Sequence, residues 1–558
     1  MSLECVMKQW IYSSVIVFSS ALLSACGGGG TIGGDSNSGT NPGTTPGTGT
    51  TTPTTPTAPT WIAGQYAAES TLQNFCATPR SGTDPFSNSA YPDKAGTAMH
   101  EKLWLRSWSN RTYLWYKELP DLDPASYSTL AYFDLLKTSN KTDSGAAKDN
   151  FHFYQDTAEY KKQTQSAVTS GYGIEWIFTA TRPPRQLTVA YTEPGSPAAT
   201  ALLSRGSKLL EVDGIDFVND NTQAGVNAIN AALFPAKAGE SHQFTVQQAD
   251  GSRKSFTLQS ADVSTVPVHN VKVLQSGSKK IGYLQFNTHI AAAQPQLISA
   301  VEQFRNEAVS ELVVDLRYNG GGLLALASQF GYMVSGPNQI QSRYFDKLQF
   351  NDKYPNTDPV TGEALEPTPF YSRGIDYNAG RLTNQTLPNL SLNRIFVLTT
   401  DNTCSASEAF INALRGIDVE VIQIGGKTCG KPYGFYPTDN CGTTYFTIQF
   451  SGVNAKGFGD YAAGFTPKPA PQFAADIKGC PVADDLSKPL GDAQEGLLKT
   501  ALFYAGNNSC PVLTAAQQAQ TQQALSAAAP LQSDGLAIRA PHIDSPLHDI
   551  SIRQPIRD

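Results

Sequence analysis

A chain of 558 residues is too long for one ordinary hydrophobic core, so two to four domains are expected. The formal net charge of −7 argues against nucleic acid as a natural partner. Beyond the N-terminal segment, no run of the sequence is apolar for long enough to span a bilayer.

The first 25 residues have the pattern of an export signal. Met7-Lys8 forms a short basic region, residues 10–22 are apolar, and Leu23-Ser24-Ala25-Cys26 resembles a bacterial lipoprotein box. This resemblance implies that cleavage leaves Cys26 as a lipidated first residue. We therefore expect a lipid-anchored protein of the bacterial cell envelope, at the periplasmic face of the outer membrane. An ordinary secretory signal or a short membrane anchor is the alternative.

The rest of the chain divides by composition. Residues 26–60 are almost entirely Gly, Thr, Pro, Ser and Asn, which predicts a flexible tether because such a segment cannot bury a core. The segments that follow are an N-terminal helical domain (61–165), a β-rich domain (166–268), an α/β domain (269–510) and a partly disordered tail (511–558). The expected fold class is therefore multi-domain α/β.

Three tryptophans characterise the predicted helical domain. Trp104 and Trp108 are spaced to share one face of a helix, and Trp115 follows closely. Core packing is the favoured interpretation of these residues. Gripping a peptide substrate is the alternative.

The β-rich domain alternates short apolar runs with turns. Asp250-Gly251 predicts a hairpin, and residues 221–234 predict a helix with an apolar inward face. The segments 195–198, 205–207 and 209–214 resemble pieces of a PDZ domain. That resemblance makes Gly171-Tyr172-Gly173-Ile174 the carboxylate-binding loop, in which glycines let backbone amides converge on a peptide terminus.

The α/β domain contains a serine at a strand-to-helix turn. Residues 395–400 and 419–424 predict buried strands, as do residues 281–286 and 311–315 earlier in the domain. Between the strands predicted at 395–400 and 419–424, Ser405-Ala406-Ser407-Glu408 opens a segment with one apolar helical face. The first amides of a helix have no partner within the helix, so this turn is suited to stabilise an oxyanion.

The SASE motif at 405–408 and the Gly-Lys pair at 430–431 together resemble the tail-specific, or C-terminal processing, proteases of the S41 type. The resemblance implies a ClpP/crotonase-like core with Ser405 as nucleophile and Lys431 as base. The segment DLRYNGGG (315–322) resembles the family's oxyanion segment, which implies that the amides of Gly321 and Ala406 form the oxyanion hole. No metal or other cofactor is expected.

Several assignments within the site stay open. Ser407 is the rival nucleophile and Lys427 is the rival base. Many S41 members have a glutamine four residues after the lysine, where this chain has Phe435. The group that orients Lys431 is therefore unassigned. Asp418 and Glu408 are the candidates, although Glu408 is equally suited to cap its own helix.

Six cysteines remain after Cys5 and Cys26 are set aside, and an even number in an exported chain predicts disulfides. A bridge between Cys404 and Cys429 would brace the site. The remaining four are Cys76, Cys441, Cys480 and Cys510.

The expected function is a Ser/Lys-type serine endopeptidase that cleaves exported polypeptides near C-terminal tails presented by the PDZ-like domain. The alternative is a catalytically inactive, membrane-tethered scaffold that only binds peptides. A Ser/His/Asp hydrolase is disfavoured because no histidine lies in a recognisable motif. The natural substrate, the cleavage preference and the oligomeric state are not predicted.

Overall fold

The computed structural model describes residues 57–522, except 143, 144, 146, 167, 516, 517 and 520. The predicted signal peptide, the lipidation site Cys26, nearly all of the tether and most of the tail lie outside the described residues. Within the described range, no helix combines the length and the apolar character needed to cross a bilayer.

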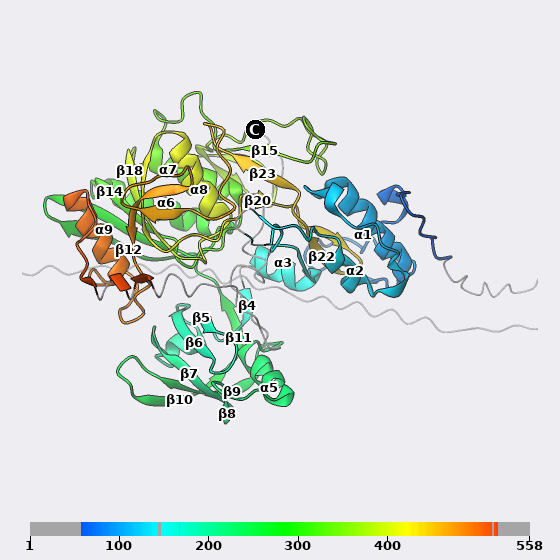
Figure 1. The fold of residues 1–558 in the computed structure, drawn as a ribbon, viewed down its shortest axis with the longest axis horizontal. Helices are drawn as coiled ribbons and strands as arrows, with labels where there is room; N and C mark the ends of the chain where they lie inside the picture. Colours follow the sequence, from blue (N-terminus) through cyan, green and yellow to red (C-terminus); the bar gives the residue numbers. More distant parts are fainter. Residues whose placement is uncertain are drawn as a thin grey trace, which may run out of the picture. The chain divides into compact units, whose positions relative to one another are not determined.

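A seven-stranded sheet forms the centre of the α/β region (Figure 1). Its order is β12-β13-β14-β18-β19-β25-β24, and neighbours run parallel except for the antiparallel pair β12 and β13. The four predicted strands are present in it as β13, β14, β18 and β19. The strands comprise β12 (Val268–Ser276), β13 (Lys279–Phe286), β14 (Glu311–Asp315), β18 (Arg394–Thr399), β19 (Glu420–Gly425), β24 (Thr466–Lys468) and β25 (Asp476–Pro481).

Helices cover both faces of this sheet (Figure 1). In β14, Val313 packs into the core on one face, whereas Leu312 and Val314 pack into the core on the other. Strands buried on both faces need apolar residues at successive positions, which explains the continuous apolar runs in the sequence. Helices α6 (Ala293–Asn306), α7 (Leu324–Ser335) and α8 (Ala406–Gly416) cover the face of Leu312, and α9 (Gly496–Asn507) covers the other.

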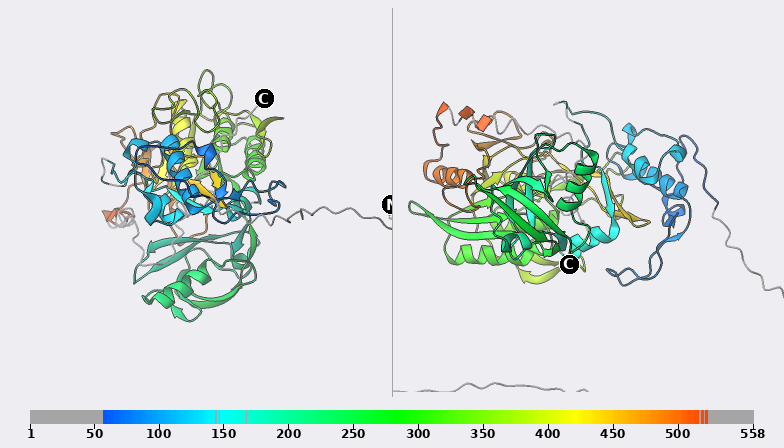
Figure 2. Two further views of the ribbon diagram at one scale, coloured as in Figure 1. Left: turned by 90° about the vertical axis from the view of Figure 1, so that its right-hand side faces the viewer. Right: turned by 90° about the horizontal axis from the view of Figure 1, so that it is seen from below.

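Residues 168–264 form a β-rich region around a core of their own (Figures 1 and 2), in which β4 pairs with β11 and the other strands form one sheet. The strand order is β10-β9-β7-β6-β5, with β8 beside β7. The predicted hairpin at Asp250-Gly251 joins β9 to β10, and the predicted helix is α5, which buries its apolar face. The elements are β4 (Val168–Gly171), β5 (Ile174–Ala180), β6 (Gln186–Thr192), α4 (Pro197–Thr200), β7 (Lys208–Val212), β8 (Ile215–Asp216), α5 (Gln223–Leu233), β9 (Ser241–Gln247), β10 (Arg253–Gln259) and β11 (Ala261–Ser264).

Arg205, in the loop before β7, joins this β-rich region to the central one. Its guanidinium donates to the Ala190 carbonyl at 2.8 Å and to the Tyr318 hydroxyl at 2.5 Å. It also forms an ion pair with Asp484 at 2.7 Å. Tyr318 belongs to the segment predicted to carry an oxyanion donor, so the two regions meet next to the candidate site.

The N-terminal segment is helical, but it shares its core with a strand from late in the chain. Trp104 and Trp108 stack with centroids 5.4 Å apart and both contact Tyr445, which supports core packing for these two residues. Strand β3 pairs with β22, with Phe153 opposite Phe446. The elements are η1 (Glu69–Thr71), β1 (Phe75–Cys76), β2 (Lys94–Ala95), α1 (Ala98–Thr112), η2 (Tyr116–Glu118), η3 (Pro124–Ser126), α2 (Thr129–Leu135), β3 (Phe153–Asp156) and α3 (Thr157–Ser166).

Short strands complete the region around the site. The order β15-β23-β20 forms one small sheet, β16 and β17 form a hairpin, and β21 and β22 pair beside β3. Their bounds are β15 (Lys347–Gln349), β16 (Arg373–Asp376), β17 (Arg381–Thr386), β20 (Tyr433–Gly434), β21 (Thr438–Asn440), β22 (Thr443–Phe446) and β23 (Phe450–Val453).

Candidate active site

Ser405 occupies a sharp turn between β18 and α8. Its backbone has φ 54° and ψ −113°, a conformation that is uncommon for residues other than glycine and is concentrated at functional sites. The residue is 6% exposed. Ala406 is the first residue of α8, so its amide is among those that have no partner within the helix.

Lys431 lies in the same pocket as Ser405. The pocket is lined by both residues, and Lys431 is only 1% exposed. Its Nζ atom lies 4.3 Å from the ring centroid of Phe435 and 4.8 Å from that of Phe151. Aromatic rings therefore surround much of the amine.

Burial lowers the pKa of Lys431 well below its usual value, while the carboxylates of Asp149 and Glu408 raise it in part. Burial prevails because the amine has lost hydration that favours its charged form. A lysine that is neutral near physiological pH can accept a proton from a serine hydroxyl.

Glu408 ties the turn of Ser405 to the loop of Lys431. Its fully buried carboxylate accepts four hydrogen bonds, from Ser405 N (3.1 Å), Thr428 Oγ1 (2.5 Å), Gly430 N (2.9 Å) and Lys431 N (2.8 Å). Burial raises its pKa to about 7, against the lowering effect of these hydrogen bonds. Glu408 thus caps α8 and also positions Lys431, through the lysine's main chain.

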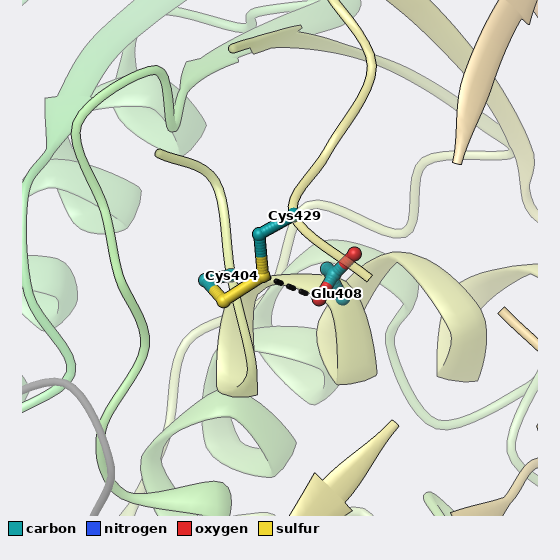
Figure 3. A group of neighbouring side chains, drawn as sticks. All are labelled: Cys404, Glu408 and Cys429. Carbon is teal, nitrogen blue, oxygen red and sulfur yellow. Dashed lines mark hydrogen bonds between the residues drawn. A yellow bond between two sulfur atoms is a disulfide. The ribbon is translucent and has the colours of Figure 1, made fainter. Parts of the chain in front are cut away.

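The predicted Cys404–Cys429 disulfide is present beside Glu408 (Figure 3). Cys404 directly precedes Ser405, and Cys429 lies two residues before Lys431. The Cys429 sulfur lies 3.3 Å from Glu408 Oε2. This is a contact and not a hydrogen bond, because a disulfide sulfur carries no hydrogen. For the same reason these sulfurs offer no thiolate to a metal ion. The other four cysteines pair as Cys76–Cys441 and Cys480–Cys510.

Asn319 connects the glycine-rich segment to the serine turn. Its carbonyl accepts hydrogen bonds from Cys404 N and from the Ser407 hydroxyl, each at 3.0 Å. Its side-chain oxygen accepts from the Gly321 amide, also at 3.0 Å. The glycine-rich segment 315–322 and the turn before α8 are therefore tied together by hydrogen bonds. The Gly321 amide, which is the proposed oxyanion donor, is hydrogen-bonded to the Asn319 side chain.

The same segment is anchored at both of its ends. Arg317 is fully buried and forms ion pairs with Asp315 at 2.9 Å and with Glu495 at 2.8 Å. Gly322 has φ 129°, and a Cβ atom there would lie 2.4 Å from the His289 carbonyl oxygen. Only glycine fits at this position without a backbone shift.

The surroundings of the rival residues differ from those of Ser405 and Lys431. The Ser407 hydroxyl is buried and donates to the Asn319 carbonyl, and Lys427 is exposed. Asp418 lies on the surface in an ion pair with Lys456, so the suggestion that it orients Lys431 is wrong.

Two residues near Lys431, Asp149 and Phe151, belong to no recognisable sequence motif. Both precede β3, in the N-terminal segment. The Asp149 carboxylate is 2% exposed and accepts hydrogen bonds from Phe151 N at 2.9 Å and from the Tyr113 hydroxyl at 2.7 Å. Trp115 also reaches the site, because its ring packs edge-on against pocket-lining Tyr433. Only tertiary packing reveals these contributions.

The loop predicted to bind a carboxylate lies between β4 and β5. Gly171 ends β4, Ile174 begins β5, and the Tyr172 side chain is buried in the core of the β-rich region. Gly173 has φ 70°, and a Cβ atom there would lie 2.3 Å from Ser196 Cβ. In the described part of the chain, β5 lies at one edge of its sheet and β10 at the other.

Fold and site together define an α/β protein with a serine and a buried lysine in one pocket. Residues 280–437, which contain both, match the family profile "Peptidase family S41". The chain therefore carries a peptidase family S41 domain.

Known relatives agree with this assignment. A carboxyl-terminal-processing protease of Picosynechococcus is 31% identical over 135 residues, which are 24% of this chain and 30% of that protein. Carboxyl-terminal-processing peptidase 2, chloroplastic, of Arabidopsis thaliana is 30% identical over 164 residues, which are 28% of this chain and 31% of that protein. The chain thus spans about a third of these relatives.

A solved structure shares the fold. The putative S41 protease from Bacteroides fragilis superimposes with a TM-score of 0.54 at 23% sequence identity. The match covers 75% of this chain and 98% of that one. It extends well beyond residues 280–437, so the likeness includes elements outside the matched family profile.

Proposed function

We propose that this protein is a serine endopeptidase in which Ser405 is the nucleophile and Lys431 is the general base. The observation that carries the proposal is the burial of Lys431 in the pocket that it shares with Ser405. Burial keeps the pKa of the amine well below its usual value, so that it can act as a base.

In the proposed reaction, Ser405 Oγ attacks the carbonyl carbon of a peptide bond while its proton passes to Lys431 Nζ. The amides of Ala406 and Gly321 stabilise the negative oxygen of the tetrahedral intermediate. Because the Gly321 amide donates to Asn319 in the absence of substrate, the oxyanion has to replace the Asn319 oxygen there. The C–N bond then breaks, the leaving amine takes the proton from Lys431, and water hydrolyses the acyl-enzyme.

The proposed substrates are exported polypeptides with unstructured C-terminal tails. The PDZ-like loop at 171–174 and the edge strand β5 would hold such a tail by strand addition. Three disulfides support an oxidising compartment. Lipid attachment at Cys26 would place the protein at the periplasmic face of the outer membrane.

The test is cleavage of unstructured peptides, followed by mass spectrometry. Ser405→Ala and Lys431→Ala should each reduce kcat by roughly 10³-fold or more, because the two groups act as one unit. Lys427→Ala removes the rival base and should leave the rate unchanged. Substantial activity in either site variant contradicts the assignment. Tight peptide binding by the wild type without any product would instead support the scaffold alternative.

A further inference from the structure

A buried histidine borders the glycine-rich segment 315–322. His289 follows β13, and its side chain is completely buried. Its amide donates to the Gly321 carbonyl at 2.8 Å, and its carbonyl accepts from the Leu323 amide at 2.7 Å. His289 therefore holds the main chain of this segment through hydrogen bonds on either side of Gly322.

The imidazole of His289 contacts the same oxygen atom that accepts from the Gly321 amide. Nδ1 lies 3.0 Å from Asn319 Oδ1, and Gly321 N also lies 3.0 Å from that oxygen. The orientation of the Asn319 side chain is fixed by its amide group, which donates to the Phe286 carbonyl at 2.8 Å. Its oxygen therefore faces both His289 and Gly321.

The charge and the tautomer of the imidazole follow from these contacts. Burial lowers the pKa of His289 to about 4, against the raising effect of the Asn319 hydrogen bond, so the ring is neutral near pH 7. A neutral imidazole carries one ring N–H, and an amide oxygen can only accept, so the hydrogen lies on Nδ1. Among the described residues Nε2 has no hydrogen-bond partner, so no contact there favours the other tautomer.

We propose that His289 is a positioning residue for the oxyanion hole, because its Nδ1–H keeps Asn319 Oδ1 hydrogen-bonded when the Gly321 amide turns to the oxyanion. The inference rests on the proposed peptidase function and adds a residue to its mechanism. Asn319 is fully buried, and its oxygen has these two donors in the described part of the chain. Without His289, the oxygen would have no donor in the transition state, and a buried acceptor without a donor raises the free energy of that state.

The experiment compares His289→Leu with His289→Asn in the full chain. Both side chains branch at the same carbon, but only asparagine offers a donor near the position of Nδ1. In His289→Leu, kcat for unstructured peptides should fall by roughly 10- to 100-fold, with KM within about twofold of the wild-type value. His289→Asn should recover most of kcat. His100→Leu is the control, because that imidazole is hydrogen-bonded to Thr97 in the N-terminal segment, and it should keep the wild-type kcat.

A peptide aldehyde tests the same step without turnover. Ser405 Oγ forms a bond to the aldehyde carbon, the serine proton passes to Lys431, and the aldehyde oxygen becomes the oxyanion. His289→Leu should weaken this adduct by the same factor as kcat, whereas His289→Asn should bind the aldehyde nearly as well as the wild type. Wild-type kcat or wild-type aldehyde affinity in a folded His289→Leu variant overturns the inference, and so do equal losses in the two variants.

A spectroscopic measurement does not depend on the activity of a variant. In NMR spectra of wild-type protein with isotope-labelled histidine, His289 should show the Nδ1–H tautomer, and its signals are assigned by their absence from His289→Asn. An Nε2–H tautomer overturns the inference.

Failure of the inference is distinguishable from failure of the proposed function. A wild type that neither cleaves peptides nor binds the aldehyde contradicts the peptidase proposal, and the inference fails with it. A wild type that cleaves peptides, together with a His289→Leu variant of unchanged kcat, contradicts the inference alone.

Discussion

The amine of Lys431 lies among groups from three separate stretches of the chain. Phe435 comes from its own loop, Phe151 and Asp149 from the N-terminal segment, and Glu408 from α8. Burial, to which these rings contribute by excluding water, lowers the lysine pKa, whereas the carboxylates raise it in part. Because these effects oppose one another, the pH dependence of cleavage should report how each neighbouring residue changes the pKa of Lys431.

Replacing Asp149 by asparagine removes a carboxylate that raises the pKa of Lys431. The lysine pKa should therefore fall further. In the proposed mechanism the neutral lysine is the active form, so kcat/KM should rise as pH increases through this pKa. In Asp149→Asn, that rise should move to lower pH. The measurement is the pH profile of kcat/KM, with Asp352→Asn as a control of equal charge change, because Asp352 is exposed and ion-paired with Lys117. A shift to higher pH would contradict the role given to Asp149.

Replacing Phe151 by alanine should have the opposite effect on the same profile. Removing the ring lets water reach the Lys431 amine, so that burial lowers the lysine pKa less. The rise of kcat/KM should then move to higher pH. The variant should also lose about 3–5 kcal/mol of unfolding free energy, because it leaves a cavity in the core. Thermal unfolding measures the second effect independently, and an unchanged pH profile in a folded variant would contradict the first.

At the scale of elements, the site depends on how the turn before α8 is held against the loop after β19. The links that join them include the Cys404–Cys429 disulfide and the carboxylate of Glu408. The disulfide constrains the chain covalently. Glu408 sets the spacing of the main chains of Ser405 and Lys431.

Changing both Cys404 and Cys429 to serine should lower stability by about 3 kcal/mol and also reduce kcat. The reduction in kcat follows because both cysteines are close in sequence to the reacting groups. The pair Cys480 and Cys510 provides a matched control, since its separation of 30 residues is close to the 25 residues of the first pair. Serine at both of these positions should lower stability by a similar amount and leave kcat unchanged. Equal effects of the two double variants on kcat would show that the first disulfide has no special role in the site.

At the scale of the whole molecule, the β-rich region contacts the glycine-rich segment 315–322 through a hydrogen bond from Arg205 to Tyr318. The proposed tail site consists of the edge strand β5 and the loop at 171–174 of this region. A tail held there would be bound by the same chain that carries the proposed Ser405 and Lys431 site.

This arrangement predicts a preference for peptides with a free C-terminus. Two peptides with the same cleavable sequence, one ending in a carboxylate and one in an amide, should differ in kcat/KM by about tenfold in favour of the carboxylate. The difference should be in KM, since the proposed tail site does not touch the reacting atoms. Equal kcat/KM values for the two peptides would remove the tail-binding role of residues 171–174.

Much of the fold was predictable because its signals are local. The apolar runs at 311–315 and 395–400 are the central strands β14 and β18, and the segment that begins with Ala406 is helix α8. The β-rich region has the predicted hairpin and helix. By contrast, no regular structure is predicted for residues 335–390, where the short strand β15 pairs with β23. Short strands whose stability comes from distant partners leave little pattern in their own residues.

The sequence by itself determined the nucleophile and base candidates, the glycine-rich segment and the Cys404–Cys429 pair, because each belongs to a short motif or lies beside one. The tertiary structure decided what surrounds Lys431. It placed Phe151 and Asp149 near the amine, and it excluded Asp418. The physical reason is that a lysine pKa depends on burial and on charges in space, and most of the groups responsible are supplied by chain segments that lie far apart in sequence.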